Sequence, residues 1–335
     1  MWHGVHVEPV LEEANPLQGT TVQQIAIIAD PGGGPPLSPW IMESQIQLNQ
    51  RHPDGRFKEI ASLIPQGAVL VGFDPLETER RPLYEILMSL EAKVFCFDGI
   101  PVDITFLDEL SEFVEAKRQA GEWIQVIIEA AVPKDQASFE DLLDISSMMN
   151  VDTGDGVMEE GRQMCLVLGQ YDGAAVDFSV AYARTLPGEL IESIPLSKKV
   201  ETAVDEDWLG CFAEAGIVGF LTHTHTQVYA GVNLVQGGSP YRQLRATRVL
   251  QWYLSEWNDA LRQVPGESIE LGLYEVQRVT EELIQSYKKA GHISEATYGI
   301  SFSAMDGEIT SDIVLFPIYG IEGISGSGVA RIQKG

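Results

Sequence analysis

The first half of the chain alternates between short apolar runs and amphipathic segments, and this alternation constrains the fold more than any other feature. Apolar runs of strand length occupy residues 68–73, 93–97 and 124–129. Between them, residues 77–90 and 103–120 carry apolar side chains at helical spacing. Strands that alternate with helices form a parallel or mixed sheet covered by helices. We therefore predict an α/β (α+β) fold, with mixed sheets flanked by helices.

The same signals predict further elements on either side of this series. Strands are expected at residues 21–30, 40–44, 163–169 and 219–229, and helices at residues 57–64, 139–144, 174–184 and 205–215. The last third of the chain predicts two long helices, residues 241–264 and 271–290, followed by a hairpin. The hairpin strands are residues 298–305 and 308–317, which flank the turn dipeptide Asp306-Gly307.

Both ends of the chain are strand-like but short. Residues 4–10 alternate and predict a short edge strand, and residues 323–335 alternate with regularly spaced glycines. A strand so short and glycine-rich does not fold alone, so it is expected to pair with another strand. A break at Leu186-Pro-Gly188 indicates a domain boundary near residue 190. Four parts are therefore expected: residues 1–20, 21–190, 191–319 and 320–335.

The charge of the chain excludes one class of partner. Its 49 acidic residues against 22 basic ones give a formal net charge of −27. Nucleic-acid binding depends on Lys and Arg, so we predict no nucleic-acid partner. The charge favours solubility. A second interpretation is a surface that meets a basic partner, or that repels its own copies until something overcomes the repulsion.

Cysteine usage and hydropathy bear on the compartment. Cys96, Cys165 and Cys211 are odd in number and lack metal-ligand spacing, so we expect them to be reduced and buried. This favours synthesis in the cytoplasm. The N-terminus lacks the basic and apolar regions of a signal peptide, and no apolar run reaches about 18 residues. We therefore expect neither signal-peptide secretion nor a membrane partner.

Three segments have the residue types of chemical sites, but none has a complete pattern. Residues 30–36, Asp-Pro-Gly-Gly-Gly-Pro-Pro, follow a strand as a phosphate loop would, yet they lack its Lys-Ser/Thr pair. His223 and His225 could share a metal ion on one face of a strand, but no third ligand is evident, and a polar strand face is favoured. Residues 150–156 depart from the calcium-loop spacing. We predict no catalytic residue, no cofactor and no metal.

One basic feature stands out in this acidic chain. Arg242, Arg245 and Arg248 are three residues apart, so they lie along one side of the predicted helix over 241–264. A solvated helix face and an ionic contact to an acidic patch on another subunit are equally compatible with this spacing.

The order of several segments resembles contractile tail sheath proteins of bacteriophages, which are related to R-type pyocin and type VI secretion sheaths. At the N-terminus the resemblance lies in residues 3–9 (His-Gly-Val-His-Val-Glu-Pro) and 20–29. In the C-terminal half it lies in Ser193-Ile-Pro-Leu, residues 208–217 and 228–233, the arginine-bearing helix, Lys289-Ala-Gly291, Asp306-Gly307, Leu315-Phe-Pro317 and residues 321–324. It covers roughly the first 45 and last 140 residues. Residues 45–190 match less well, and the chain is short for the family.

The resemblance implies a structural subunit rather than an enzyme. Sheath subunits stack as hexameric rings around an inner tail tube and contract to drive the tube through the envelope of a target cell. Their extended N- and C-terminal β-arms pair with neighbouring subunits. Here these would be residues 1–20 and 320–335, on either side of an α/β sheath domain (21–190) and a C-terminal domain facing the tube (191–319). The arm residues would include Val5, Val7, Ile324, Val329 and Ile332.

Partners and location follow from the same resemblance. The partners would be further copies of the chain, the tail tube protein, and the baseplate and tail terminator proteins. Assembly would take place in the host cytoplasm, and the product would be part of the virion. Ionic contacts to the tube or another subunit are expected from Arg242, Arg245, Arg248, Arg278, Lys288 and Lys289. Two alternatives stay open: the sheath of a bacteriocin or secretion-type device, and, less favoured, an α/β metal-dependent hydrolase.

Overall fold

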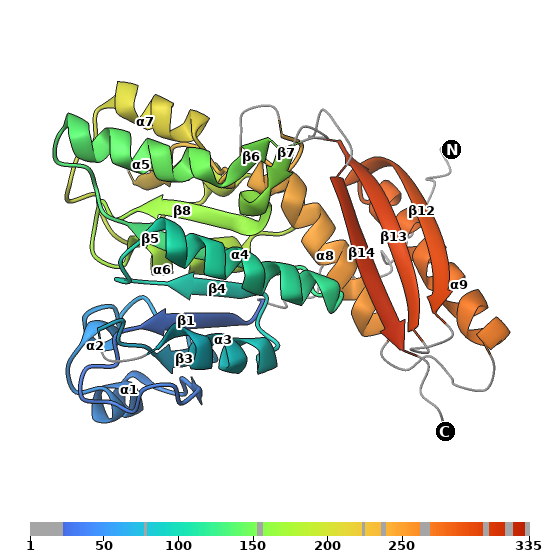
Figure 1. Ribbon diagram of the computed structural model, residues 1–335, viewed down its shortest axis with the longest axis horizontal. Helices are drawn as coiled ribbons and strands as arrows, with labels where there is room; N and C mark the ends of the chain where they lie inside the picture. The colour runs from blue at the N-terminus through green and yellow to red at the C-terminus, as the bar shows by residue number, and fades with distance from the viewer. Residues whose placement is uncertain are drawn as a thin grey trace, which may run out of the picture.

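The computed structural model describes residues 23–76, 79–152, 157–222, 225–235, 239–261, 269–303, 308–318 and 324–331. A larger α/β part lies beside a smaller part made of two long helices and a three-stranded sheet (Figure 1). Mixed sheets flanked by helices were the predicted fold class, and this prediction is confirmed. The predictions on Val5, Val7, His223 and Ile332 concern residues outside the described ranges.

A seven-stranded sheet forms the centre of the larger part, in the order β2-β3-β1-β4-β5-β8-β9. All neighbouring strands are parallel except β2, which runs antiparallel to β3. The strands are β1 (Ile25–Ala29), β2 (Trp40–Ile41), β3 (Val69–Gly72), β4 (Val94–Phe97), β5 (Gln125–Ala130), β8 (Met164–Leu168) and β9 (Ile217–Val218). The central strands are buried on both faces, which explains why they read as continuous apolar runs.

Helices cover both faces of this sheet and build two cores. Along β1, Ile25 and Ile27 join the core under α1, α2 and α6, whereas Ala26 and Ile28 join the core under α3, α4, α5 and α7. The helices are α1 (Gln45–Arg51), α2 (Arg56–Glu59), α3 (Arg80–Ser89), α4 (Ile104–Gln119), α5 (Gln136–Met148), α6 (Ala174–Arg184) and α7 (Glu206–Glu214). Two short 3₁₀ helices, η2 (Glu160–Gln163) and η3 (Ile191–Ser193), lie in the connections.

Local sequence signals fix where several helices begin. The Asp103 carboxylate accepts a hydrogen bond from the Phe106 backbone N–H at 2.7 Å, which caps α4. At α5, Asp135 and Ser138 form a reciprocal capping box. Such caps satisfy backbone N–H groups that have no partner within the helix.

The smaller part is built on two helices, α8 (Leu244–Leu261) and α9 (Ile269–Lys289), and three strands. The strands β12 (Ile293–Ser303), β13 (Glu308–Pro317) and β14 (Ile324–Arg331) form an antiparallel sheet in that order. A third core fills the space between sheet and helices and includes Tyr253, Trp257, Val276, Ile309 and Ile313. Within it, the Trp257 indole Nε1 donates to the Thr280 hydroxyl at 2.9 Å.

One expected strand needs correction. The strand expected over residues 219–229 is an antiparallel hairpin of β10 (Phe220–Thr222) and β11 (Thr226–Val228), because Thr222 and Thr226 pair across a tight connection. A second hairpin pairs β6 (Asn150–Asp152) with β7 (Val157–Glu159). β9 pairs with β8 and extends the large sheet, and the domain boundary near residue 190 stays a prediction.

Candidate subunit interface

The three-stranded sheet places the C-terminal segment at one of its edges. β14 pairs antiparallel with β13 from Leu315 opposite Ile324 to Glu308 opposite Arg331. In this register Val329 lies opposite Thr310. The segment that the sequence indicated as a pairing strand is therefore a strand, and its partner here is β13 of the same chain. Pairing with neighbouring subunits stays a prediction.

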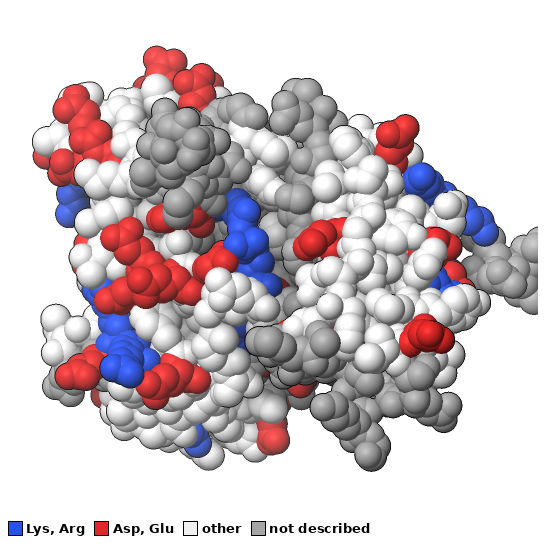
Figure 2. Space-filling view, turned by 45° about the vertical axis from the view of Figure 1, so that its right-hand side comes forward, with Lys and Arg blue, Asp and Glu red and all other residues white. Residues whose placement is uncertain are grey.

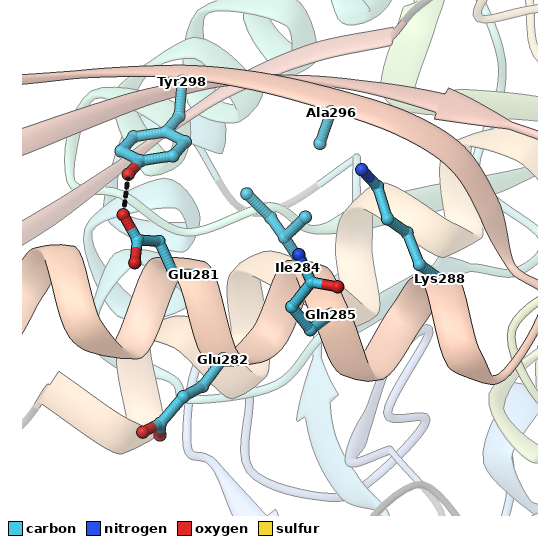
Figure 3. A pocket seen from close by; sticks show the side chains of 7 residues that line it. All are labelled: Glu281, Glu282, Ile284, Gln285, Lys288, Ala296 and Tyr298. Atoms are coloured by element: carbon cyan, nitrogen blue, oxygen red, sulfur yellow. Dashed lines mark hydrogen bonds between the residues drawn. The ribbon is translucent and has the colours of Figure 1, made fainter.

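The opposite edge of the sheet is β12, which lies beside a groove along α9 (Figure 3). Within the described part of the chain, β12 pairs with β13 alone. The side chains that line the groove come from α9 and β12: Glu281, Glu282, Ile284, Gln285, Lys288, Ala296 and Tyr298. The Tyr298 hydroxyl donates to Glu281 Oε1 at 2.7 Å, and this bond raises the pKa of Tyr298. A long strand with an unpaired edge is a template for adding another strand.

Helix α9 carries the second group of predicted contact residues. Arg278 donates from Nη1 to Glu282 at 2.7 Å and from Nε to Glu275 at 3.0 Å, so its charge is matched within the helix. Lys288 and Lys289 occupy the last turn, where cations interact favourably with the helix dipole. The first turns of the same helix expose three large apolar side chains, Ile269, Leu271 and Tyr274.

Charge is unevenly distributed over the surface. On the face shown in Figure 2, carboxylates gather over the α/β part, whereas the described residues of the smaller part present a mostly uncharged surface. In agreement with this view, β12 contains one charged residue, Glu295, in eleven positions. The strand β12 therefore offers an edge that copies can approach with less repulsion than the acidic part would cause.

The three regularly spaced arginines bind the α/β part of their own chain. Arg242 donates from Nη1 to the Glu214 carbonyl at 2.8 Å and from Nη2 to the Ala213 carbonyl at 2.5 Å, at the end of α7. The Arg245 guanidinium donates to the Gly188 carbonyl. The helix predicted over 241–264 begins at Leu244, so Arg242 precedes α8 and only Arg245 and Arg248 lie on it. The carbonyls at the end of α7 lack partners within that helix, and Arg242 satisfies them. For Arg242 and Arg245 a contact to another subunit or to the tube stays a prediction.

Arg248 corrects the expectation of a solvated or ionic contact. Its side chain is 2% exposed, and its Nε donates to the Thr185 carbonyl at 2.7 Å. The guanidinium carbon lies 4.2 Å from the centroid of the Tyr182 ring, close enough for a cation–π interaction. Burial lowers the pKa of Arg248 and raises the pKa of Tyr182 to about 12. The expectation was wrong because α8 packs this face against α6.

A second charged cluster, which the sequence analysis missed, surrounds Arg56. Its guanidinium contacts Asp98 at 2.5 Å, Glu129 at 3.4 Å and Asp172 at a shorter distance, from the carboxyl ends of β4, β5 and β8. Burial and the charge of Asp98 raise the pKa of Glu129. Ligand sites of open α/β sheets occur at this edge. The signal was an acidic residue at the end of successive strands, as at Asp98 and Glu129.

The other candidate sites can also be located. In the loop after β1, Gly32 and Gly33 donate their backbone N–H groups to Asp30 at 2.8 Å and Asp54 at 2.6 Å, so carboxylates occupy donors that a phosphate would need. His225 is exposed in the β10–β11 connection. Among the described residues, no three His, Cys, Asp or Glu side chains are placed to hold a metal ion. No helix in the described ranges is long and apolar enough to cross a membrane.

The cysteines differ in exposure. Cys96 and Cys165 are buried, as expected, and burial raises the pKa of both thiols. Cys211 is exposed on α7, so the expectation of burial was wrong for this residue. Its position on a surface helix places it away from the apolar stripe formed by Leu209 and Phe212.

The chain is similar to known proteins in its structure and not in its sequence. No protein-family model matches the sequence, and no curated protein matches it significantly. The sheath tail protein Lin1278 from Listeria innocua superposes with a TM-score of 0.62 at 9% identity, covering 93% of this chain and 96% of that one. The chain has the fold of contractile tail sheath proteins.

Two further solved structures support this assignment. The sheath complex of an extracellular contractile injection system, PVC, in its contracted state gives a TM-score of 0.59 at 11% identity and covers 100% of this chain and 95% of its counterpart. The sheath tail protein DSY3957 from Desulfitobacterium hafniense gives 0.52 at 12% identity and covers 80% of this chain and 64% of its own. The likeness to Lin1278 and to the PVC sheath includes residues 45–190, where the sequence resemblance is weaker. The sheath fold therefore extends over both the α/β part and the smaller part.

Proposed function

We propose that this chain is a structural subunit of a contractile sheath, which polymerises around an inner tube and contracts to drive the tube through a target envelope. The observation that carries the proposal is the chain-long likeness to sheath proteins, one of them a sheath complex in the contracted state. In this role the protein is a mechanical component and not an enzyme. The Arg56 cluster is then an internal ionic network that holds α2 against the strand ends.

The edges of the smaller sheet provide the polymerising contacts in this proposal. The edge of β12 receives an extended strand from another copy, with the N-terminal segment that includes Val5 and Val7 as the donor. A head-to-tail contact of this kind does not close on itself, so it propagates as a helical stack of rings. The tail tube protein, the baseplate and the tail terminator protein are the remaining partners. Lys288, Lys289 and Arg278 on α9 are the proposed ionic contacts of the smaller part.

A sheath that assembles and contracts in this way occurs in two biological settings. The first is the tail of a bacteriophage, assembled in the host cytoplasm and carried on the virion. The second is a secretion-type or bacteriocin-type injection device. Two likenesses favour the second setting, since they are to parts of the extracellular system PVC and of the anti-feeding prophage baseplate, both in contracted states.

Electron microscopy of the purified protein tests the proposal. A sheath subunit is expected to form tubes or stacked rings with a regular repeat. The salt concentration must be high enough to screen the repulsion between the acidic subunits. The variant lacking residues 323–335 is expected to form none, because it lacks β14. The matched control lacks only residues 332–335 and keeps β14 intact. A monodisperse monomer at all salt and protein concentrations would contradict the proposal.

A further inference from the structure

The short helix α2 lies at the carboxyl ends of the central strands of the large sheet (Figure 1). A helix of four residues does not hold its shape alone, so its contacts with the sheet keep it in place. The backbone N–H of Arg56 donates to the carbonyl of Asp30, just beyond β1, at 3.1 Å. The side chains of Phe57 and Ile60 are fully buried in the core under α1, α2 and α6. Residues 53–63 are called the α2 segment below.

The α2 segment is also attached to the sheet by charge. The guanidinium of Arg56 has five N–H groups, which match the hydrogen bonds it makes to carboxylates. Two of these bonds go to Asp98, and one each goes to Glu59, Glu129 and Asp172. Asp98 is fully buried and Glu129 is 15% exposed, whereas Glu59 is 61% exposed and therefore screened by solvent. The inner cluster thus consists of Arg56 and the three carboxyl groups at the strand ends.

This inner cluster has one carboxyl group more than it has cations. Its acids are Asp98, Glu129 and Asp172. Its cations are Arg56 and Lys198, whose Nζ lies 3.7 Å from Oδ2 of Asp172. With one bound proton the cluster is therefore neutral. Glu129 is the group that holds this proton, because burial, followed by the charge of Asp98, raises its pKa to about 8.

Other polar groups face Glu129 without adding a formal positive charge. On α6, the backbone N–H of Ala175 donates to Oε2 of Glu129 at 3.3 Å. Asp177 on the same helix accepts a hydrogen bond from the hydroxyl of Tyr171. Burial raises the pKa of Tyr171 and that of the Cys96 thiol on β4, so both of these groups stay neutral. The charge of the cluster therefore changes near neutral pH through the proton on Glu129.

We propose that the α2 segment is a pH-sensitive switch: it stays closed over the strand ends while the cluster holds its proton, and it opens ahead of the rest of the chain when this proton is lost. The inference concerns the single chain and does not depend on the proposed sheath function. Opening withdraws Arg56 and admits water to Asp98 and Glu129. It also uncovers Phe57 and Ile60, and the burial of these two side chains holds the segment closed at low pH.

The direction of the pH effect follows from two opposing influences on Glu129. The attraction of Arg56 favours the ionised carboxyl group, but the exclusion of water disfavours it and is the larger influence. The ionised group is therefore more stable in the open segment, where water reaches it. A proton that is bound more tightly in the closed form stabilises that form. Closure is therefore fully favoured below the ordinary pKa of a glutamate, and it weakens as the pH rises through about 8.

Hydrogen exchange tests the switch. The wild-type chain is kept dilute and unassembled, and exchange is followed by mass spectrometry at a series of pH values from 6 to 8.5. After correction for the intrinsic exchange rate, the protection of residues 53–63 is expected to fall at least 10-fold over this range. The reason is that the loss of one proton changes the opening constant by up to about tenfold per pH unit. At pH 8.5 this protection is also expected to be at least 10-fold lower than that of β4, because the segment opens on its own.

A matched pair of variants connects the effect to the proton. Glu129→Gln keeps the shape of the protonated acid and does not titrate, so the protection of its α2 segment is expected to be the same at pH 6 and pH 8.5. The control Glu85→Gln changes a side chain that is 71% exposed, and it is expected to retain the wild-type fall.

Three results overturn the inference. The first is wild-type protection of residues 53–63 that does not change with pH. The second is a fall that Glu129→Gln retains. The third is equal protection of the α2 segment and β4 at pH 8.5, because the segment would then open only when the whole chain unfolds. The first and third results come from the wild-type chain alone. Since no step requires assembly, a chain that forms no tubes would contradict the sheath function and leave this test unaffected.

Discussion

Arg248 on α8 donates a hydrogen bond from Nη1 to Oε1 of Gln23 at 3.2 Å, across 225 positions of sequence. The backbone N–H of Gln23 also donates to the Ala183 carbonyl at the end of α6, at 3.4 Å. The point at which the chain enters β1 is therefore fixed to the helix that carries the C-terminal sheet. In a sheath, an arm that precedes Gln23 would pull on both parts of the subunit together.

Replacing Arg248 is expected to destabilise the whole chain. In Arg248→Met, the Thr185 carbonyl and the Gln23 amide oxygen lose a buried donor, and unsatisfied buried acceptors cost about 1–3 kcal/mol each. We expect the free energy of unfolding to fall by about 2–4 kcal/mol in urea titrations. The control is Arg81→Met, whose side chain is 90% exposed and whose change is expected to stay within about 0.5 kcal/mol. Equal effects of the two substitutions would contradict the role assigned to Arg248.

Glu129 is expected to make stability depend on pH. Its side chain is 15% exposed, and burial together with the charge of Asp98 raises its pKa to about 8 in the folded chain. An acid with a raised folded pKa binds its proton more tightly in the folded state. The stability that the folded chain gains from this proton is therefore fully present below the ordinary pKa of a glutamate. It is lost as the pH rises through about 8.

The variant Glu129→Gln isolates this contribution. The amide keeps the shape of the protonated acid but does not titrate, so the variant is expected to gain stability over the wild type on the order of 2 kcal/mol between pH 5 and 8. Chemical denaturation at a series of pH values measures the difference. The exposed Glu85→Gln serves as control, with no such trend expected. A Glu129→Gln curve parallel to the wild-type curve would contradict the protonation of Glu129.

The elements that the sequence predicted well are those whose signal is local. The helix over residues 174–184 has the bounds of α6, and the strands over 68–73 and 93–97 contain β3 and β4. Apolar periodicity and caps act within one element, so a single sequence reveals them. The sequence predicts one strand in place of the β10–β11 hairpin because the connection, His223-Thr224-His225, contains neither Gly nor Asn to indicate a turn.

The predicted site residues depend on contacts that are not local in the sequence. Arg245 and Arg248 lie on α8 as predicted, whereas Arg242 precedes its first residue. The surface that faces these arginines depends on how α8 packs, and that surface is the α/β part. The Arg56 cluster joins residues that are 42 and 116 positions apart. Only the sheet topology brings them together, so spacing along the chain could indicate the acidic strand ends but not the arginine between them.

The groove between α9 and β12 is expected to matter for assembly and not for folding. Ala296 is a half-buried residue on β12 that lines the groove at the end where Lys288 lies, away from Glu281 and Glu282 (Figure 3). In Ala296→Glu a longer, charged side chain would occupy the groove at the edge of the sheet and hinder an incoming strand. We expect tube formation, measured by sedimentation, to slow at least 10-fold while the circular dichroism spectrum stays unchanged. The control is Thr297→Glu, one residue along on the exposed opposite face of β12. Equal slowing by both variants would point to charge alone and contradict a role for the groove.

The core of the smaller part can be tested at a single hydroxyl. Thr280 is fully buried on α9, and its Oγ1 accepts the Trp257 indole N–H at 2.9 Å. In Thr280→Val the shape is nearly retained, but the buried indole N–H loses its acceptor, which costs about 1–3 kcal/mol. Because Trp257 on α8 reaches Thr280 on α9 within the third core, we expect unfolding at a lower urea concentration, followed by tryptophan fluorescence. The control is Thr297→Val on exposed β12, where the same change is expected to stay within about 0.5 kcal/mol. Unchanged unfolding of Thr280→Val would mean that the Trp257–Thr280 bond contributes nothing to holding the two helices together.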